Sequence, residues 1–192
     1  MKFKTIWGDA TPRNIMWLFQ KYGVPRSTIE IGVFEGNTTF NMVQEVIQHY
    51  PEYRHYAIDP YGESDDLKDE VVSDAKALFL ENLADFENRD SITFINDYST
   101  PALLQLIRDN VQVDFIFIDG DHRASTVLDD LVLSFQLLKV GGVILCDDCT
   151  TWRQEKLQNM PRLAVDGFIH SNIDRIEVLE VPSSFQVAFR KI

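Results

Sequence analysis

Short apolar segments that alternate with longer amphipathic ones constrain the fold of this chain more than any other feature of its sequence. Five segments are rich in β-branched and aromatic residues: 27–32, 55–59, 91–96, 113–119 and 142–147. Several are almost wholly apolar, which is typical of strands that are covered on both faces. Because helical patterns separate them, we predict an α/β fold with a mostly parallel sheet and right-handed crossovers.

The segments between these strands predict helices on both faces of the sheet. The expected helices cover residues 12–22, 38–48, 66–87, 101–109, 124–139 and 151–165. Two late apolar runs, 173–181 and 185–190, flank the sequence Pro182-Ser183-Ser184 and predict a hairpin. Neither an internal repeat nor a linker interrupts the pattern, so we expect one doubly wound domain over residues 1–192.

The charge balance argues against several classes of partner. The chain has 18 basic and 30 acidic side chains and a net charge of −12, which repels nucleic-acid backbones and anionic lipids. It contains no run of about eighteen apolar residues, and its first residues lack the pattern of a signal peptide. We therefore expect a cytoplasmic protein with a small-molecule partner, without nucleic-acid or membrane binding. A homo-oligomer is compatible with the sequence, which does not fix the oligomeric state.

The two cysteines, Cys146 and Cys149, are spaced C-D-D-C. Cys146 ends the apolar run GGVILC and is expected in a strand, whereas a redox C-x-x-C places its first thiol at a helix N-terminus. Zinc would need two further ligands of comparable quality, and the sequence holds no second cysteine pair. We interpret both thiols as structural groups in a reducing compartment.

Residues suited to chemistry follow each of the five predicted strands. In doubly wound sheets, ligands bind beyond the carboxyl ends of the strands. The residues at these ends are Glu30 and Gly32, Asp59, Asp97, Asp119, and the pair Asp147 and Asp148. The topology therefore predicts that they meet along one edge.

The first strand runs into the sequence E-I-G-V-F-E-G-N-T-T. Gly32 and Gly36 would let the backbone turn tightly and approach a ligand before a helix that begins near Thr38. The spacing is not the G-x-G-x-x-G of dinucleotide-binding proteins, and no lysine follows as in a P-loop. A simple turn remains the alternative to a binding loop.

Two acids suggest that the ligand contains adenosine. Asp59 ends the second strand, where a carboxylate can accept hydrogen bonds from both ribose hydroxyls. Asp97 follows the third strand and could accept a hydrogen bond from an adenine amino group. Each acid alone could be a solvated loop residue. Together with the loop that contains Gly32 and Gly36, called the glycine loop below, they favour an adenosine site.

Asp119, Asp147 and Asp148 follow the fourth and fifth strands, which are neighbours in the predicted sheet. Three carboxylates in close proximity repel one another unless a cation or shared protons compensate. Oxygen ligands select a hard divalent ion, so we expect Mg²⁺ or Mn²⁺ at these residues. The alternative for Asp147 and Asp148 is a pair of exposed turn acids, one of which caps the next helix.

The combination resembles class I S-adenosylmethionine-dependent methyltransferases over nearly the whole chain. The resemblance implies a seven-stranded sheet of order 3-2-1-4-5-7-6 with strand 7 antiparallel. It implies that Glu30 and Gly32 border the methionine part of S-adenosyl-L-methionine, Asp59 holds the ribose and Asp97 lies by the adenine. The other expected cofactor-binding residues are Gly36, Tyr98 and Asp119.

The sequences IDGDH and ILCDD resemble metal-dependent small-molecule O-methyltransferases, namely the macrocin, mycinamicin and novobiocin-sugar types and, more distantly, catechol O-methyltransferase. The resemblance implies that Asp119, Asp147 and Asp148 bind Mg²⁺. It offers two candidates for the catalytic base, His122 and Asp121. We favour His122, because an imidazole with an ordinary pKa of about 6.5 accepts protons near neutral pH.

Two rival functions remain open. One is a methyltransferase that uses no metal, and the other is a non-catalytic protein that binds S-adenosylmethionine. The glycine spacing disfavours a nicotinamide-dependent oxidoreductase. A sugar hydroxyl, a catechol and a carboxylic acid are all compatible acceptors.

Overall fold

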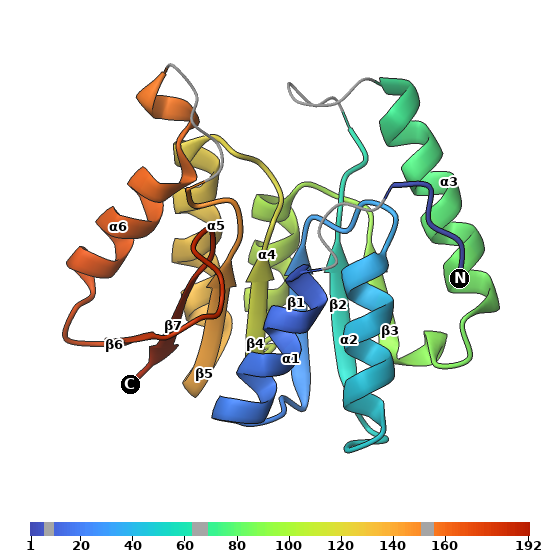
Figure 1. The fold of residues 1–192 in the computed structure, drawn as a ribbon, viewed down its shortest axis with the longest axis horizontal. Coiled ribbons are helices and arrows are strands. Elements are labelled where there is room, and N and C mark those ends of the chain that lie inside the picture. Colours follow the sequence, from blue (N-terminus) through green and yellow to red (C-terminus); the bar gives the residue numbers. More distant parts are fainter. Residues whose placement is uncertain (6–9, 63–68, 151–155) are drawn as a thin grey trace.

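The protein forms a seven-stranded sheet between two layers of helices (Figure 1). The computed structural model describes residues 1–5, 10–62, 69–150 and 156–192. The strands are β1 (Ser27–Ile31), β2 (Arg54–Ile58), β3 (Ile92–Ile95), β4 (Val113–Ile118), β5 (Leu138–Cys146), β6 (Ile176–Leu179) and β7 (Val187–Lys191). Their order is β3-β2-β1-β4-β5-β7-β6, and β7 runs antiparallel to both β5 and β6. The predicted fold class and strand order are confirmed.

Six α-helices of the described residues cover the sheet. They are α1 (Ala10–Tyr22), α2 (Asn37–Ile47), α3 (Asp69–Asp85), α4 (Ser99–Arg108), α5 (Ala124–Leu137) and α6 (Pro161–Ser171). Two 3₁₀ turns, η1 (Arg89–Ser91) and η2 (Leu157–Asn159), precede β3 and α6. Helices α1 to α3 pack on one face of the sheet and α4 to α6 on the other.

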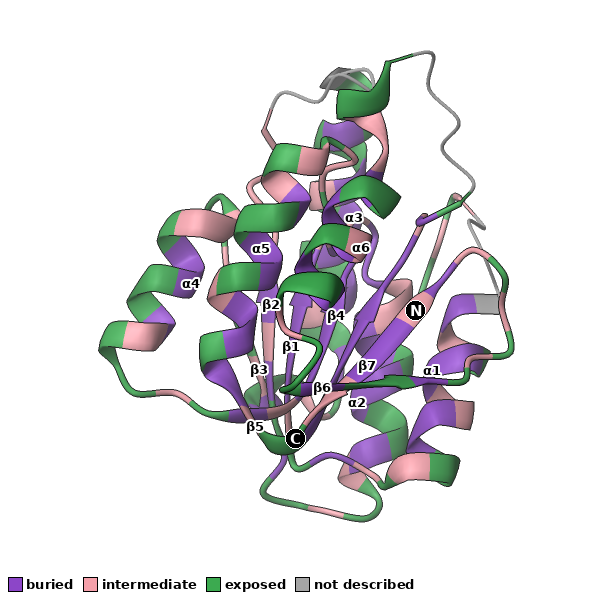
Figure 2. Cartoon of the chain, turned by 90° about the vertical axis from the view of Figure 1, so that its left-hand side faces the viewer, coloured by how far each residue is buried: buried purple, intermediate pink, exposed green. Residues whose placement is uncertain are grey.

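The alternation of side chains along each strand divides the core into two halves. In β4, Phe115 and Phe117 pack with α1 and α2, whereas Ile116 and Ile118 pack with α4 and α5. Both halves are built mainly from apolar side chains, and Figure 2 shows the buried residues on the strands and on the inward faces of the helices. Large apolar side chains buried in this way contribute about 1.5–3 kcal/mol each.

Two predicted helices differ from the structure. The helix predicted at 124–139 ends at Leu137, and β5 begins at once with Leu138, so the sequence LKVGG belongs to a strand. The helix predicted at 151–165 is replaced by α6, which begins at Pro161 because the fixed φ of proline suits the first helical turn. Residues 66–68 and 151–155 of the predicted helices lie outside the described residues.

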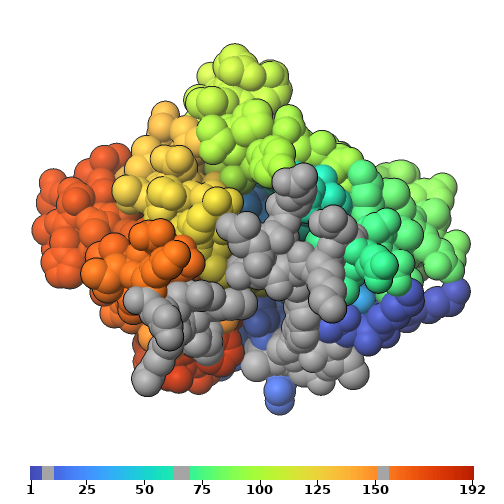
Figure 3. Space-filling model, turned by 90° about the horizontal axis from the view of Figure 1, so that it is seen from above, coloured from blue at the N-terminus to red at the C-terminus, as the bar shows by residue number. Residues whose placement is uncertain are grey.

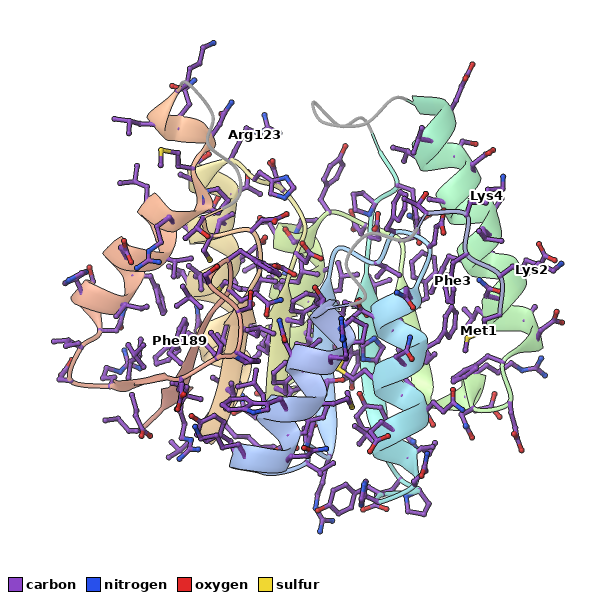
Figure 4. All side chains as sticks on the ribbon, in the orientation of Figure 1. Met1, Lys2, Phe3, Lys4, Arg123 and Phe189 are labelled. Atoms are coloured by element: carbon purple, nitrogen blue, oxygen red, sulfur yellow. The ribbon has the colours of Figure 1, made fainter. Side chains whose placement is uncertain are left out.

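The N-terminal residues lie along α3 and reach the glycine loop (Figure 4). Lys2 and Lys4 pair with Glu81 and Asp74 of α3. The backbone N–H groups of Lys4 and Thr5 both donate to the buried carboxylate of Glu35, at 2.8 and 3.1 Å. No helix among the described residues combines the length and the apolar character that a membrane-spanning segment needs.

Gly32 occupies a position where no other residue fits. Its φ is +88°, and a Cβ atom there would lie 2.0 Å from the carbonyl oxygen of Asp119. The loop after β1 therefore touches the loop after β4 through bare backbone. Glycine is therefore required at position 32 for the contact between these two loops, independently of any role in ligand binding.

We predict that Gly32→Ala is much more destabilising than Gly141→Ala. Gly141 has a similar φ of +85°, but nothing lies within 4 Å of its Cβ position. Gly141→Ala should therefore lower the free energy of unfolding only by the left-handed strain, about 1–2 kcal/mol. Gly32→Ala adds the clash with Asp119. Its decrease in the free energy of unfolding, measured by denaturant unfolding, should therefore be clearly larger. Equal losses would contradict the steric explanation.

Candidate active site

The residues predicted from the sequence meet along the carboxyl edge of the parallel strands. The first residue after each of the strands β5, β4, β1 and β2 donates its N–H to the last carbonyl of the neighbouring strand. These bonds are Asp147 to Ile118 at 3.0 Å, Asp119 to Ile31 at 2.8 Å, Gly32 to Ile58 at 3.0 Å and Asp59 to Ile95 at 3.2 Å. The sheet register thus sets four predicted site residues in one row. Figure 3 views the molecule from this edge, with η2 and α6 in orange on one side and α3 in green on the other.

Asp59 fastens the glycine loop to the loop after β2. Its Oδ2 accepts the N–H groups of Val33 and Phe34 at 2.8 and 3.0 Å, and its Oδ1 accepts the N–H of Tyr61 at 2.8 Å. The Tyr61 hydroxyl donates back to the carbonyl of Phe34, and burial raises the pKa of Tyr61, which keeps this donor protonated. Phe34 and Tyr61 both have left-handed backbones, with φ of 51° and 47°.

The Asp59 carboxylate has room for a further donor. An ionised carboxylate offers about four lone-pair positions, and the three backbone N–H groups use three of them. Sequence reasoning missed Tyr61, because nothing in its sequence context distinguishes it from an ordinary loop aromatic.

Glu30 lies in a buried polar network instead of at the surface. Its carboxylate accepts the hydroxyl of Thr39 at 2.5 Å and faces Nε2 of His55 at 3.1 Å. The other ring nitrogen of His55 lies 2.7 Å from the hydroxyl of Thr28. Glu30 thereby connects β1 and β2 to the start of α2. That Glu30 borders the methionine part of the cofactor remains a prediction.

The segment after β3 is tied to the loop after β2. The Asn96 side-chain amide donates to the carbonyls of Asp59 and Pro60, both at 2.9 Å. Asp97 is exposed, and its Oδ1 accepts the N–H of Tyr98 at 2.8 Å. Tyr98 is also exposed, with its hydroxyl 2.7 Å from the Cβ position of Gly62. Asp97 and Tyr98 therefore lie on the same rim as Asp59.

Asp119, His122 and Asp148 form a cluster that could hold a metal ion. One ligand atom from each lies within 4.8 Å of the others, and His122 Nε2 is 3.1 Å from Asp148 Oδ2. The pKa of Asp119 is well above its usual range, because the carboxyl is buried and because Asp147, Asp148 and Glu30 repel its charge. A cation would relieve this repulsion, so the donor set fits a divalent ion.

The third predicted metal ligand, Asp147, lines a small recess together with Asp119 and His122, and its carboxylate also accepts three hydrogen bonds. Its Oδ2 accepts the Thr11 hydroxyl at 3.1 Å and the Gln186 side-chain amide at 3.0 Å, while its Oδ1 accepts the N–H of Asp148 at 2.8 Å. Sequence reasoning missed Thr11 and Gln186, which lie 136 and 39 positions from Asp147 along the chain.

Asp121 lies just before α5 and pairs with Arg123, which is labelled in Figure 4. It accepts the N–H of Arg123, the Nε of the same side chain and the hydroxyl of Thr126. Partial burial would raise the pKa of Asp121, but these hydrogen bonds and the charge of Arg123 outweigh it and leave the pKa below its usual range. The carboxylate is therefore a poorer proton acceptor than a free one.

Both cysteines are buried beside the acidic loop. Cys146 ends β5, and the Cys149 thiol lies 3.6 and 3.5 Å from the carbonyls of Cys146 and Asp147. Burial raises the pKa of Cys149 to about 12, so the thiol stays protonated. These surroundings support a structural role for both.

Residues 29–149 match the model of a methyltransferase domain family. The chain belongs to this family. Its strand order is that of class I S-adenosylmethionine-dependent methyltransferases, as predicted.

One curated relative of this chain agrees with the family assignment. A candidate caffeoyl-CoA O-methyltransferase of Arabidopsis thaliana is 30% identical over 127 residues, which are 66% of this chain and 47% of the relative. The chain spans about half the length of the curated relatives it matches.

Solved structures show the same fold. The Bacillus cereus O-methyltransferase in complex with S-adenosylhomocysteine has a TM-score of 0.69 at 16% identity and covers 98% of this chain and 84% of its own. The Streptomyces achromogenes O-methyltransferase TomG, in complex with S-adenosylmethionine, has a TM-score of 0.69 at 14% identity. The match covers 98% of this chain and 82% of TomG.

We predict that Asp119→Asn stabilises the metal-free protein at neutral pH. A folded pKa above the unfolded one means that stability falls as pH rises, so removal of the charge should help most near pH 7 and not in acid. Thermal unfolding in EDTA should show a midpoint about 2–4 °C higher for each kcal/mol of relieved repulsion.

Asp121→Asn is the matched control for this prediction. The folded pKa of Asp121 is lowered, so its charge stabilises the fold above the ordinary pKa of aspartate, and this contribution is lost as pH falls. The variant should therefore unfold at a lower temperature near pH 7. A lower midpoint for Asp119→Asn as well would contradict the repulsion.

Proposed function

We propose that this methyltransferase transfers the methyl group of S-adenosylmethionine to a hydroxyl of a small molecule at the carboxyl edge of the sheet. The backbone contact between Gly32 and Asp119 carries the proposal, because it places the loop clasped by Asp59 beside the cluster of Asp119, His122 and Asp148. A donor bound at the first loop and an acceptor bound at the cluster would be neighbours.

The loops after β1, β2 and β3 would hold the cofactor. The remaining acceptor position of Asp59 suits a ribose hydroxyl, and Asp97 and Tyr98 lie on the rim where an adenine would extend. The solved relatives in complex with S-adenosylmethionine or S-adenosylhomocysteine support this choice of cofactor.

Asp119, Asp147 and Asp148 would hold a divalent cation, Mg²⁺ or Mn²⁺, which when bound lowers the pKa of the acceptor hydroxyl and orients it. His122 would accept the proton. Its Nε2 lies 3.1 Å from Asp148 Oδ2, and this contact would hold the plane of the ring. The role of this chain is then to align the acceptor oxygen with the methyl group and sulfur, since the displacement is in line.

The acceptor is proposed to be a small molecule on grounds of charge. A chain of net charge −12 disfavours a nucleic-acid acceptor, and the cluster lies beside a small recess whose lining includes Asp119, His122 and Asp147. A hydroxyl of a sugar or a catechol fits a carboxylate-and-imidazole site of this kind.

One observation favours a second candidate, a methyltransferase that uses no metal. The pair of His122 Nε2 and Asp148 Oδ2 is already at hydrogen-bond distance, as in sites where a carboxylate orients a catalytic imidazole. In that reading, the acids shape the recess and His122 alone accepts the proton.

We predict that S-adenosylhomocysteine stabilises the protein and that NAD does not. At a ligand concentration one hundred times Kd, the gain is about 2.7 kcal/mol, which thermal unfolding measures as several degrees. Asp59→Ala should abolish most of this shift. The same shift with NAD, or an unchanged shift in Asp59→Ala, would refute the cofactor site.

We predict that EDTA abolishes methyl transfer and that added Mg²⁺ restores it. Release of S-adenosylhomocysteine should be followed with catechol, sugar and carboxylic-acid acceptors. His122→Gln should depress the rate most for the least acidic hydroxyl, whereas its cofactor affinity should stay within about twofold, because the imidazole acts only on the acceptor. Full turnover in EDTA would select the candidate without a metal.

A further inference from the structure

Helices α5 and α6 pack side by side (Figure 1), and a groove of about 380 Å³ lies between them. It follows α5 from Leu128 to Gln136 and the C-terminal half of α6, and its lining includes Arg175 and Lys191. The recess beside His122 lies near the start of the same two helices, and the two linings have no residue in common. The groove is therefore distinct from the candidate active site.

The floor and walls of the groove are largely apolar. Phe135 and Phe168 are each 5% exposed and lie edge to face, with their ring centroids 5.4 Å apart. Leu128 and Val132 are 41% and 46% exposed, and both belong to the lining. An apolar molecule placed here would cover side chains that the fold leaves in contact with water, which is favourable.

Gly167 keeps the α6 side of the groove open. It lies in the interior of α6 without a positive φ, so its backbone conformation does not require glycine. A Cβ atom at this position would meet nothing within 4 Å, so close packing does not require glycine either. Glycine inside a helix typically lowers stability relative to alanine. What glycine provides at this position is space in the groove.

Two cations lie at one end of the groove. Arg175 precedes β6 and Lys191 ends β7, and their charges lie over the ring of Phe135, at 4.9 and 4.7 Å from its centroid. Lys191 Nζ donates to the carbonyls of Phe135 and Leu138 at the end of α5, at 2.8 and 2.7 Å, which leaves one of its three N–H groups. Capping of α5 thus explains the position of Lys191 but not that of Arg175.

No acid in the part of the chain that the structure describes balances these two charges. The lining contains neither aspartate nor glutamate, although the chain has 30 acidic side chains against 18 basic ones. Arg175 donates to the side chain of Asn172, and Lys191 donates to backbone carbonyls. Burial and the charge of Arg175 lower the pKa of Lys191. An anion between the two cations would offset this repulsion.

We propose that the groove binds a small carboxylic acid with an aromatic or short aliphatic body, with the carboxylate between Arg175 and Lys191 and the body against Phe168 and Val132. The proposal goes beyond the methyl transfer proposed above and does not depend on it. Ligand pockets typically have about 300–1,000 Å³, so a groove of about 380 Å³ suits a small molecule better than a helix of a partner protein. A second copy of the chain is disfavoured because two chains of net charge −12 repel each other.

Naphthalene carboxylate and its neutral amide, naphthalene carboxamide, form a matched pair of probes with the same apolar body. Their binding to the full chain should be measured by titration calorimetry at low salt. We expect the carboxylate to bind about two- to fivefold more tightly than the amide, which is the range of an exposed ion pair. This preference should fall as the salt concentration rises. Saturation with S-adenosylhomocysteine should leave the affinity for the carboxylate unchanged, because the groove lies apart from the cofactor edge.

Four variants test where the probes bind. Arg175→Gln should abolish the preference for the carboxylate and leave the affinity for the amide unchanged. Arg108→Gln is its matched control, since Arg108 is an exposed arginine at the end of α4, and it should keep the preference. Gly167→Leu should fill the groove and abolish binding of both probes. Gly167→Ala should keep binding and raise the unfolding temperature, because alanine is the better helix former.

Several results would overturn the proposal. Equal affinities of the unaltered protein for the two probes would exclude the role of the cations, and unchanged binding in Gly167→Leu would exclude the groove. Displacement of the carboxylate by S-adenosylhomocysteine would place the probe at the cofactor edge. If sedimentation shows that Gly167→Leu converts a dimer into a monomer, the groove is an interface between copies of the chain instead.

Amide chemical shifts of the unaltered protein keep the test decisive if Gly167→Leu does not fold. Addition of the carboxylate should shift the amide signals of Gly167 and Ser171, which line the groove, and leave the signals of Gly32 and His122 in place. The opposite pattern would refute binding at the groove.

Discussion

The row of hydrogen bonds that continues the sheet past the strand ends is the constraint on which the site depends. Each of Asp147, Asp119, Gly32 and Asp59 is the first residue after its strand, and each donates its N–H to the neighbouring strand. The position of each of these residues along the row is thus fixed by the backbone register of the sheet and not by side-chain preference. A slip of one residue in any strand would turn one of these groups away from the row.

The fold follows from the sequence because its signals are strong and mutually consistent. Apolar segments of strand length, separated by amphipathic ones, leave a doubly wound sheet as the simplest solution. The prediction is wrong where the local preference for a helix is outweighed by strand pairing. Leucine and lysine at 138 and 139 favour a helix, but Leu138 pairs with Val113 of β4, so β5 begins there. Residues that follow strands could be predicted as site residues because topology alone collects them at one edge.

The internal geometry of the site could not be predicted in the same way. Asp147 and Asp148 are adjacent and chemically identical, and only their tertiary partners distinguish them: Thr11 and Gln186 for Asp147, and His122 for Asp148. Tyr61 was missed, and His55 could be treated as structural but not paired, for a related reason. Their partners, Phe34 and Glu30, come from other elements, and no periodicity or spacing in a single sequence encodes such a pairing.

Left-handed backbone at residues with side chains is concentrated at this edge. Among the described residues, Phe34, Tyr61 and Asp148 adopt it in the loops of the site, and Asn110 adopts it elsewhere, as asparagine readily does. Such conformations typically cost about 1–3 kcal/mol each. Part of the folding free energy is thus used to order these loops. Glycine in place of Tyr61 would relieve the strain, but it would also remove the hydroxyl that bonds to Phe34 and the ring that packs beside Phe79 and Phe94. An engineer in search of heat resistance would therefore lose the rigidity that a reaction between two bound molecules requires.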